Sequence, residues 1–244
     1  MRSSLLSLLL AVMFACPAFG ETFDDLAWDK ALEGAAKGGR VDYQALATDP
    51  RLKQFVARLA TFEPRTLPSK EARLAFWLNA YNAFAITGVL KHYPGIRSVA
   101  EVAPDFGFFK ARDFKVGGRS LSLNDIENDI VRKEFADPRI HAALNCASVS
   151  CPPLRAEAYR AEILDRQLDE QMRGFIRDSS RNRVVVGTGE VQLSSIFDWY
   201  RADFKGVGAF VARYLDAPEA ASVLAAEKAG NLRFLPYDWS LNGR

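Results

Sequence analysis

The pattern of apolar and polar positions along the chain predicts more helices than strands. Two hairpins are indicated, one turning at Gly117-Gly118 and one at Gly187 to Gly189, since glycine adopts the backbone angles of tight turns. A further strand is expected at Arg139 to Leu144, and with the hairpins it would form one small antiparallel sheet. The expected fold is therefore α+β, a mainly helical domain around that sheet. The predicted helices cover residues 23–37, 51–61, 69–91, 123–135, 162–177, 195–204, 207–215 and 217–229.

The predicted helix at residues 69–91 is apolar nearly all round, which is typical of a central helix buried on every side. Asn79 and Asn82 interrupt this apolar surface and, being three residues apart, share one face of the helix. Buried amides need hydrogen-bonding partners. We favour the interpretation that both tie down adjoining loops. The alternative is that they orient a substrate or a catalytic histidine, as an asparagine does in Cys-His-Asn enzymes.

Residues 1–20 have the pattern of a secretory signal peptide. Arg2 supplies the positive end, Leu5 to Ala15 is too short to span a bilayer as a helix, and Ala18-Phe19-Gly20 suits signal peptidase. Lipoprotein processing at Cys16 is the rival interpretation, although the preceding residues match a lipobox poorly. We expect a single domain at residues 21–244, periplasmic or secreted, with no integral membrane segment after signal removal.

Composition and charge narrow the possible partners. The formal net charge is +2 and no basic stripe stands out, so nucleic acid is not an expected partner. His92 lies far in sequence from His141, Cys146 and Cys151, so no metal site is predicted, and no motif indicates a cofactor. The expected partner is a small-molecule, peptide or envelope ligand whose identity the sequence leaves open.

The segment from Arg139 to Pro153 holds His141 together with Cys146 and Cys151. An imidazole and a thiol at a strand-to-loop junction can form a base and a nucleophile, because a nearby imidazole favours the reactive thiolate. Two cysteines five positions apart in an exported protein can instead form a disulfide, which would block Cys146. Such a short loop removes little chain entropy, so the disulfide would affect local shape more than global stability.

Acidic and aromatic side chains supply the remaining candidates. Glu127 lies beside the apolar stripe of its predicted helix, as a surface acid or as a buried group that orients His141. The clusters Asp198-Trp199-Tyr200 and Tyr237-Asp238-Trp239 either lock chain ends by packing or line a ligand pocket.

The chain contains, in this order, the blocks RLAFWLNAYNAF, SLNDIEN, RIHAALNCASVSCPPL, IFDWYRADF and FLPYDWSLN. In wording and order these five blocks resemble the domain of unknown function 547 family. The resemblance covers residues 46–244 and implies no established activity. It implies export, and a thiol role for Cys146 with an accessory role for Cys151. The chain has Asn128 where the family has a histidine, so that position is left out of the expected site.

Two functions from different classes remain open at this point. The first is a cysteine-dependent hydrolase or acyl transferase acting on an amide or ester, with Cys146 as nucleophile and His141 as base. Glu127 or Asn79 would then orient the histidine. The second is a non-enzymatic exported binding or scaffold domain in which Cys146 and Cys151 form a structural disulfide.

Overall fold

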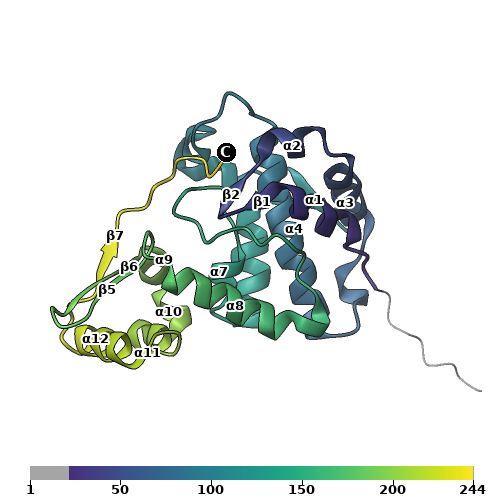
Figure 1. Cartoon of the computed structure of the whole chain (residues 1–244). Coiled ribbons are helices and arrows are strands. Elements are labelled where there is room, and N and C mark those ends of the chain that lie inside the picture. The colour runs from purple at the N-terminus through teal and green to yellow at the C-terminus, as the bar shows by residue number, and fades with distance from the viewer. Residues whose placement is uncertain (1–21, 244) are drawn as a thin grey trace, which may run out of the picture.

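The computed structural model describes residues 22–243 (Figure 1). The predicted signal peptide, its cleavage point and Cys16 lie outside the described residues. Helix α4, Lys70–Leu90, runs through the middle of the molecule with other elements around it (Figure 1). No helix within residues 22–243 is both long and apolar enough to cross a membrane.

Helix α4 begins where Ser69 caps it, accepting a hydrogen bond from the Ala72 backbone N–H at 3.0 Å. From Leu74 to Ile86 every residue is buried, which confirms the predicted central helix. Phe84 is fully buried and stacks on Phe114, with ring centroids 4.7 Å apart. The first hydrophobic cluster of the core is built around this helix.

The N-terminal elements cover one side of α4. Helix α1, Leu26–Ala35, and helix α3, Pro50–Thr61, pack on each other, and Trp28 stacks on Phe55 at 5.6 Å. Between them lie the short strands β1, Ala36–Lys37, and β2, Arg40–Val41, and helix α2, Tyr43–Thr48.

The strands form separate small sheets, so the expectation of one antiparallel sheet is wrong, although the mainly helical α+β class is confirmed. The hairpin of β3, Phe114–Val116, and β4, Arg119–Leu121, stands alone. Strands β5, Arg183–Val185, and β6, Glu190–Ser194, form the second predicted hairpin. Strand β7, Arg233–Leu235, extends that hairpin by pairing parallel to β6.

The strand predicted at residues 139–144 is also wrong, because Ile140–Ala143 forms the short helix α7. Asp137 accepts the Arg139 backbone N–H at 2.9 Å and so starts the turn. The turn continues as Leu144 N–H donates to the Ile140 carbonyl at 3.0 Å. A short, mostly apolar run is ambiguous between a buried strand and a buried helix, and here the turn that Asp137 starts leads into the helix.

Helix α8, Leu164–Arg177, joins the two hydrophobic clusters of the core. Its Leu168 packs in the cluster around α4, whereas Met172 and Phe175 pack in a second cluster. That second cluster also holds β6 and four helices: α9, Ile196–Trp199; α10, Arg201–Phe204; α11, Val207–Ala212; and α12, Ala217–Lys228.

Short helical segments connect these larger parts. They are η1 (Pro64–Thr66), η2 (Val99–Glu101), η3 (Pro104–Phe106), α5 (Gly107–Lys110), the π-helical η4 (Asp125–Val131), α6 (Arg132–Phe135) and η5 (Ala161–Ile163). Ser122 lies just before η4, and its Oγ accepts the Asp125 N–H at 3.0 Å.

The last residues, 236–243, form a C-terminal strap. In Figure 1 the strap, in yellow, runs from β7 across the molecule to end near β2. The Val41 N–H donates to the Asn242 carbonyl at 3.0 Å, and the Tyr43 hydroxyl donates to Oδ1 of the same asparagine at 2.7 Å. The strap therefore bonds the end of the chain to its N-terminal elements.

We predict that Phe84→Ala lowers the free energy of unfolding by about 3–5 kcal/mol, because a large aromatic side chain leaves a cavity in a packed core. Denaturant unfolding monitored by circular dichroism measures the change. Leu224→Ala, on the exposed face of α12, is the control and should change stability by less than about 0.5 kcal/mol. An unfolding midpoint for Phe84→Ala equal to that of the control would show that α4 is not the centre of the core.

Candidate functional site

A cleft of about 470 Å³ lies where α4, η4, α7 and α9 meet the loop after α7 and the C-terminal strap. Its lining includes Glu127, His141 and Cys146, three of the side chains singled out in the sequence. The cleft is thus the candidate site that the geometry assembles from distant parts of the chain.

Glu127 is partly buried in this cleft and is held by two tyrosines. The Tyr81 hydroxyl, from α4, donates to one carboxylate oxygen at 3.2 Å, and the Tyr200 hydroxyl, after α9, donates to the other. Desolvation raises the pKa of Glu127, while these two hydrogen bonds act in the opposite direction. Burial likewise raises the pKa of both tyrosines, so each stays protonated and can donate.

His141 is oriented by Asp203. Its Nε2 lies 2.8 Å from Oδ2 of Asp203, on α10, and its ring stacks on Tyr200 with centroids 4.0 Å apart. The Asp203 carboxylate also accepts two hydrogen bonds from Arg132, at 2.7 and 2.8 Å, and these hold the pKa of Asp203 below its ordinary value. An Nε2–H donated to this carboxylate leaves the other ring nitrogen of His141 as an acceptor.

Burial dominates the charge state of His141. Its side chain is 1% exposed, and desolvation lowers its pKa to about 4 despite the neighbouring Asp203. The imidazole is therefore neutral at neutral pH. A neutral ring can accept a proton, but it supplies no positive charge to stabilise a thiolate beside it.

Cys146 and Cys151 form a disulfide, with Cα atoms 6.0 Å apart. The Cys146 sulfur faces the cleft and lies 3.0 Å from the hydroxyl of Tyr237. The Cys146 backbone N–H donates to the Cys151 sulfur at 2.9 Å. Cys151 is 1% exposed and lies behind its partner. In this state Cys146 is not a nucleophile, and His141 bonds Asp203 rather than a thiol.

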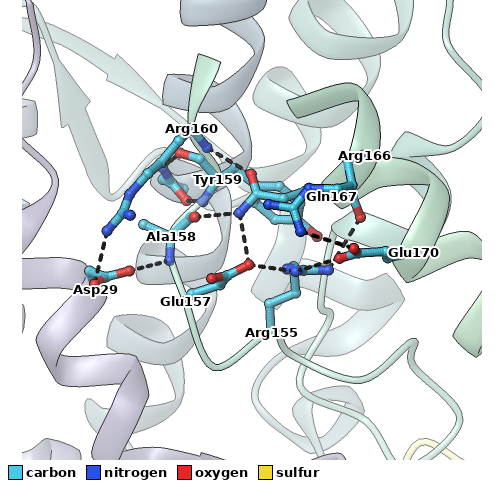
Figure 2. Close-up of polar contacts among 10 residues, drawn as sticks. Asp29, Arg155, Glu157, Ala158, Tyr159, Arg160, Arg166, Gln167 and Glu170 are labelled. Atoms are coloured by element: carbon cyan, nitrogen blue, oxygen red, sulfur yellow. Dashed lines mark hydrogen bonds and ion pairs between the residues drawn. The ribbon is translucent and has the colours of Figure 1, made fainter. Parts of the chain in front are cut away.

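Asn79 does not orient His141, which corrects one of the roles considered from the sequence. It bonds the backbone of Tyr159 through both ends of its amide, each at 2.8 Å. The loop around Tyr159 is fixed further by Asp29 from α1 and Gln167 from α8, as Figure 2 shows. Glu127 does not orient His141 either, because its carboxylate is taken by the two tyrosines.

Asn82 acts on the cleft indirectly. Its Nδ2 donates to the Ala143 carbonyl at 2.9 Å, and its Oδ1 accepts the Asn145 N–H at 2.8 Å. Both amides of α4 therefore tie down loops, as we favoured from their spacing. Asn82 fixes the segment between His141 and Cys146, and so it helps to set the positions of both side chains.

Aromatic rings form the open wall of the cleft. Trp239 contacts Tyr237, Trp199 and Phe106, with ring centroids 4.6, 5.8 and 4.8 Å apart. Trp199 is 50% exposed and Phe106 is 44% exposed. Both aromatic clusters predicted from the sequence thus contribute to the lining, through Trp199, Tyr200, Tyr237 and Trp239.

Comparison with known proteins finds a family similarity in the central segment of the chain. Residues 64–176 match the model of a family described as "Protein of unknown function, DUF547". This segment is similar to that family. No curated protein and no solved structure matches the chain.

The DUF547 match contains Glu127, His141 and both cysteines of the disulfide. The blocks that carry Asp203 and the strap aromatics lie beyond residue 176. The cleft is therefore built from the matched segment and from parts of the chain outside it.

Sequence reasoning missed Asp203 and Arg132. Each lies on a short helix whose sequence gives no reason to expect this partner. Asp203 meets His141 across 62 positions of the chain and Arg132 across 71, so only tertiary packing brings the three together. The pairing of an acid with a histidine carries no local spacing signal. Within the described residues no three His, Cys, Asp or Glu side chains come together in a way that could hold a metal ion.

The lowered pKa of His141 predicts a pH-dependent stability. The unfolded chain binds a proton at this histidine near pH 6.5, whereas the folded protein does so only near pH 4. Stability from this group is therefore full above pH 6.5 and falls by about 3 kcal/mol as the pH drops to 4.

His141→Gln should remove this slope, because glutamine can still donate to Asp203 but does not titrate. Urea unfolding of both proteins between pH 7 and pH 4 measures the difference. Glu127 is present in both proteins, so its contribution to the pH dependence of stability cancels when the two slopes are compared. Equal slopes for wild type and variant would show that His141 is charged in the folded protein.

Proposed function

We propose that this protein is a non-enzymatic binding domain, exported to the periplasm or beyond, whose aromatic cleft takes a small organic ligand. The ligand would present a flat apolar face, such as a sugar or aromatic ring, and a hydrogen-bond donor. The observation that carries the proposal is the half-exposed Trp199 at a cleft that holds the Glu127 carboxylate. Exposed apolar surface at a polar-lined cleft is typical of ligand sites.

The chemistry of the cleft supports this ligand class. Trp199, Trp239 and Phe106 offer ring faces against which a flat ligand can pack. Glu127 has its two tyrosine donors on one side and can accept a further hydrogen bond from a ligand, since a carboxylate has several lone pairs. Lys110 lines the same cleft and offers a positive charge to an acidic substituent of the ligand.

Export rests on the residues of the signal-like N-terminus and agrees with the chemistry of the cysteine pair. Disulfides persist in oxidising compartments such as the bacterial periplasm, and thiols in the cytosol are kept reduced. A structural Cys146–Cys151 bridge would therefore be formed after export and would remain intact in the binding domain.

A second candidate is the cysteine-dependent hydrolase or acyl transferase, because Cys146 and His141 line the same cleft. It requires prior reduction of the disulfide. The Cys146 thiol would then pass its proton to the free nitrogen of His141, and the thiolate would attack the carbonyl carbon of an amide or ester. The amine or alcohol leaves with that proton, and water or an acceptor takes the acyl group. Asp203, rather than Glu127 or Asn79, would orient the histidine.

We predict that the uncharged fluorophore N-phenyl-1-naphthylamine binds this cleft, because it combines flat rings with one N–H donor. Trp199→Ala should weaken binding about tenfold, which is roughly 1.4 kcal/mol of lost ring contact. Fluorescence titration measures the affinity. Val186→Ala, another exposed apolar residue but outside the cleft, is the matched control and should leave the affinity unchanged. Equal losses in both variants would place the probe elsewhere and contradict the binding proposal.

The two candidate functions predict different thiol chemistry. For a binding domain, mass spectrometry should find Cys146 and Cys151 unmodified by iodoacetamide until a reductant is added. In Cys151→Ser, where Cys146 is free, alkylation at pH 6–7 should be slow, as for a thiol of pKa about 8.5. It should also be indifferent to an added His141→Ala substitution. Fast alkylation that His141→Ala slows would overturn this expectation and favour the thiol enzyme.

A further inference from the structure

The disulfide and the aromatic wall of the cleft belong to one hydrogen-bonded unit. We call residues 146–151 the disulfide loop. The Val149 N–H donates to the Ser240 carbonyl at 2.8 Å, and the Asn242 N–H donates to the Ala147 carbonyl at 3.0 Å. The disulfide loop and the C-terminal strap thus run beside each other and share backbone hydrogen bonds at both ends of their contact.

A side-chain contact joins the two segments inside the cleft. The Tyr237 hydroxyl lies 3.0 Å from the Cys146 sulfur and 3.4 Å from the Cys151 sulfur. Tyr237 and the next aromatic residue of the strap, Trp239, form part of the cleft wall. Tyr237 therefore joins this wall to the disulfide.

The disulfide loop has an uncommon backbone shape. Ala147 has a φ of 65°, in the left-handed region that residues with a Cβ seldom adopt. The Cys151 sulfur accepts backbone N–H groups from both sides of this alanine, from Cys146 at 2.9 Å and from Ser148 at 3.4 Å. The loop shape that meets the strap thus depends on where this sulfur is held.

A second clamp holds the far side of the disulfide loop. Arg181 donates to the Cys151 carbonyl at 2.8 Å and to the Val149 carbonyl at 2.7 Å, and it is ion-paired with Asp178. This clamp does not depend on the oxidation state of the cysteines. We therefore expect reduction to move Cys146 and the strap, while the side of the loop that Arg181 holds stays in place.

We propose that the Cys146–Cys151 pair is a redox latch for the cleft, an inference that rests on the proposed binding function. A dithiol reductant, either a small molecule or a protein, supplies two electrons and two protons. The S–S bond breaks, two thiols form, and the reductant becomes a disulfide. Unbonded sulfur atoms cannot stay at bonding distance, so Cys146 moves away from Cys151. The contact of Tyr237 with both sulfurs is lost, the strap loosens, and the cleft loses part of its aromatic wall.

The short spacing of the two cysteines makes this change local. Because the closed loop is short, its reduction returns little chain entropy to the unfolded state. Neither cysteine is a member of the two hydrophobic clusters of the core, although Tyr237 and Trp239 of the strap pack against them. The latch can thus open while the rest of the fold persists.

Hydrogen exchange followed by mass spectrometry tests the latch without any ligand. On reduction with dithiothreitol, exchange at the amides of Val149 and Asn242 should become at least about tenfold faster, while amides of α12 should not change. The double variant Cys146→Ser with Cys151→Ser should behave like the reduced protein without dithiothreitol. Tyr237→Phe, which keeps the disulfide but removes the hydroxyl, should raise strap exchange in the oxidised protein. Unchanged strap exchange on reduction overturns the proposal, and so does faster exchange throughout the molecule.

A binding measurement separates the latch from the proposed function. The affinity of N-phenyl-1-naphthylamine should fall about fivefold or more on reduction and in the double serine variant. If the probe fails to bind the oxidised protein, the proposed function is wrong, and strap exchange alone decides whether the latch exists. If the probe binds both redox forms equally while strap exchange increases, the latch does not control the cleft and the proposal is overturned.

Discussion

The structure depends on the burial of α4 on every side, because a fully surrounded helix can carry polar side chains only where other segments come to meet them. Asn79 and Asn82 are both 3% exposed, and each is satisfied by a loop backbone rather than by water. An unmade hydrogen bond at such a site costs about 1–3 kcal/mol, so these loops are held firmly. One of them, bonded by Asn82, carries the chain from His141 to Cys146. The geometry of the cleft thus follows from polar groups on a buried helix.

The same constraint explains how much of the fold the sequence predicted. Helix α8 was found because its apolar face repeats over several turns, and α4 was found because its apolar residues continue for longer than a strand. The hairpins were found because their glycines adopt positive φ angles that tight turns require. Residues 139–144 were misassigned because a short run of buried residues looks alike in a strand and in a helical turn. The number of sheets was predicted wrongly because a sequence pattern indicates where strands lie but not which strands pair with each other.

The candidate site was predictable in its parts but not in its pairing. Cys146, His141, Glu127 and the two aromatic clusters all reach one cleft, as their residue types suggested. The hydrogen-bonding partners could not be predicted from the sequence. The partner of His141 lies 62 residues away, and the partners of Glu127 lie 46 and 73 residues away. Long-range pairs of this kind are set by the packing of α4, α9 and α10, which leaves no local trace in the sequence.

The charges beside His141 are compensated within the protein. Arg132 and Asp203 neutralise each other beside His141, and burial keeps the imidazole uncharged. Desolvation raises the pKa of Glu127, and the hydrogen bonds from Tyr200 and Tyr81 oppose that rise. A cysteine nucleophile needs a positive neighbour, and the cation nearest His141 is already paired with a carboxylate. In the proposed latch, the oxidised Cys146 affects the cleft through its contact with Tyr237 on the strap. A change in the oxidation state of Cys146 would then reach a ligand as a change in the position of the aromatic wall.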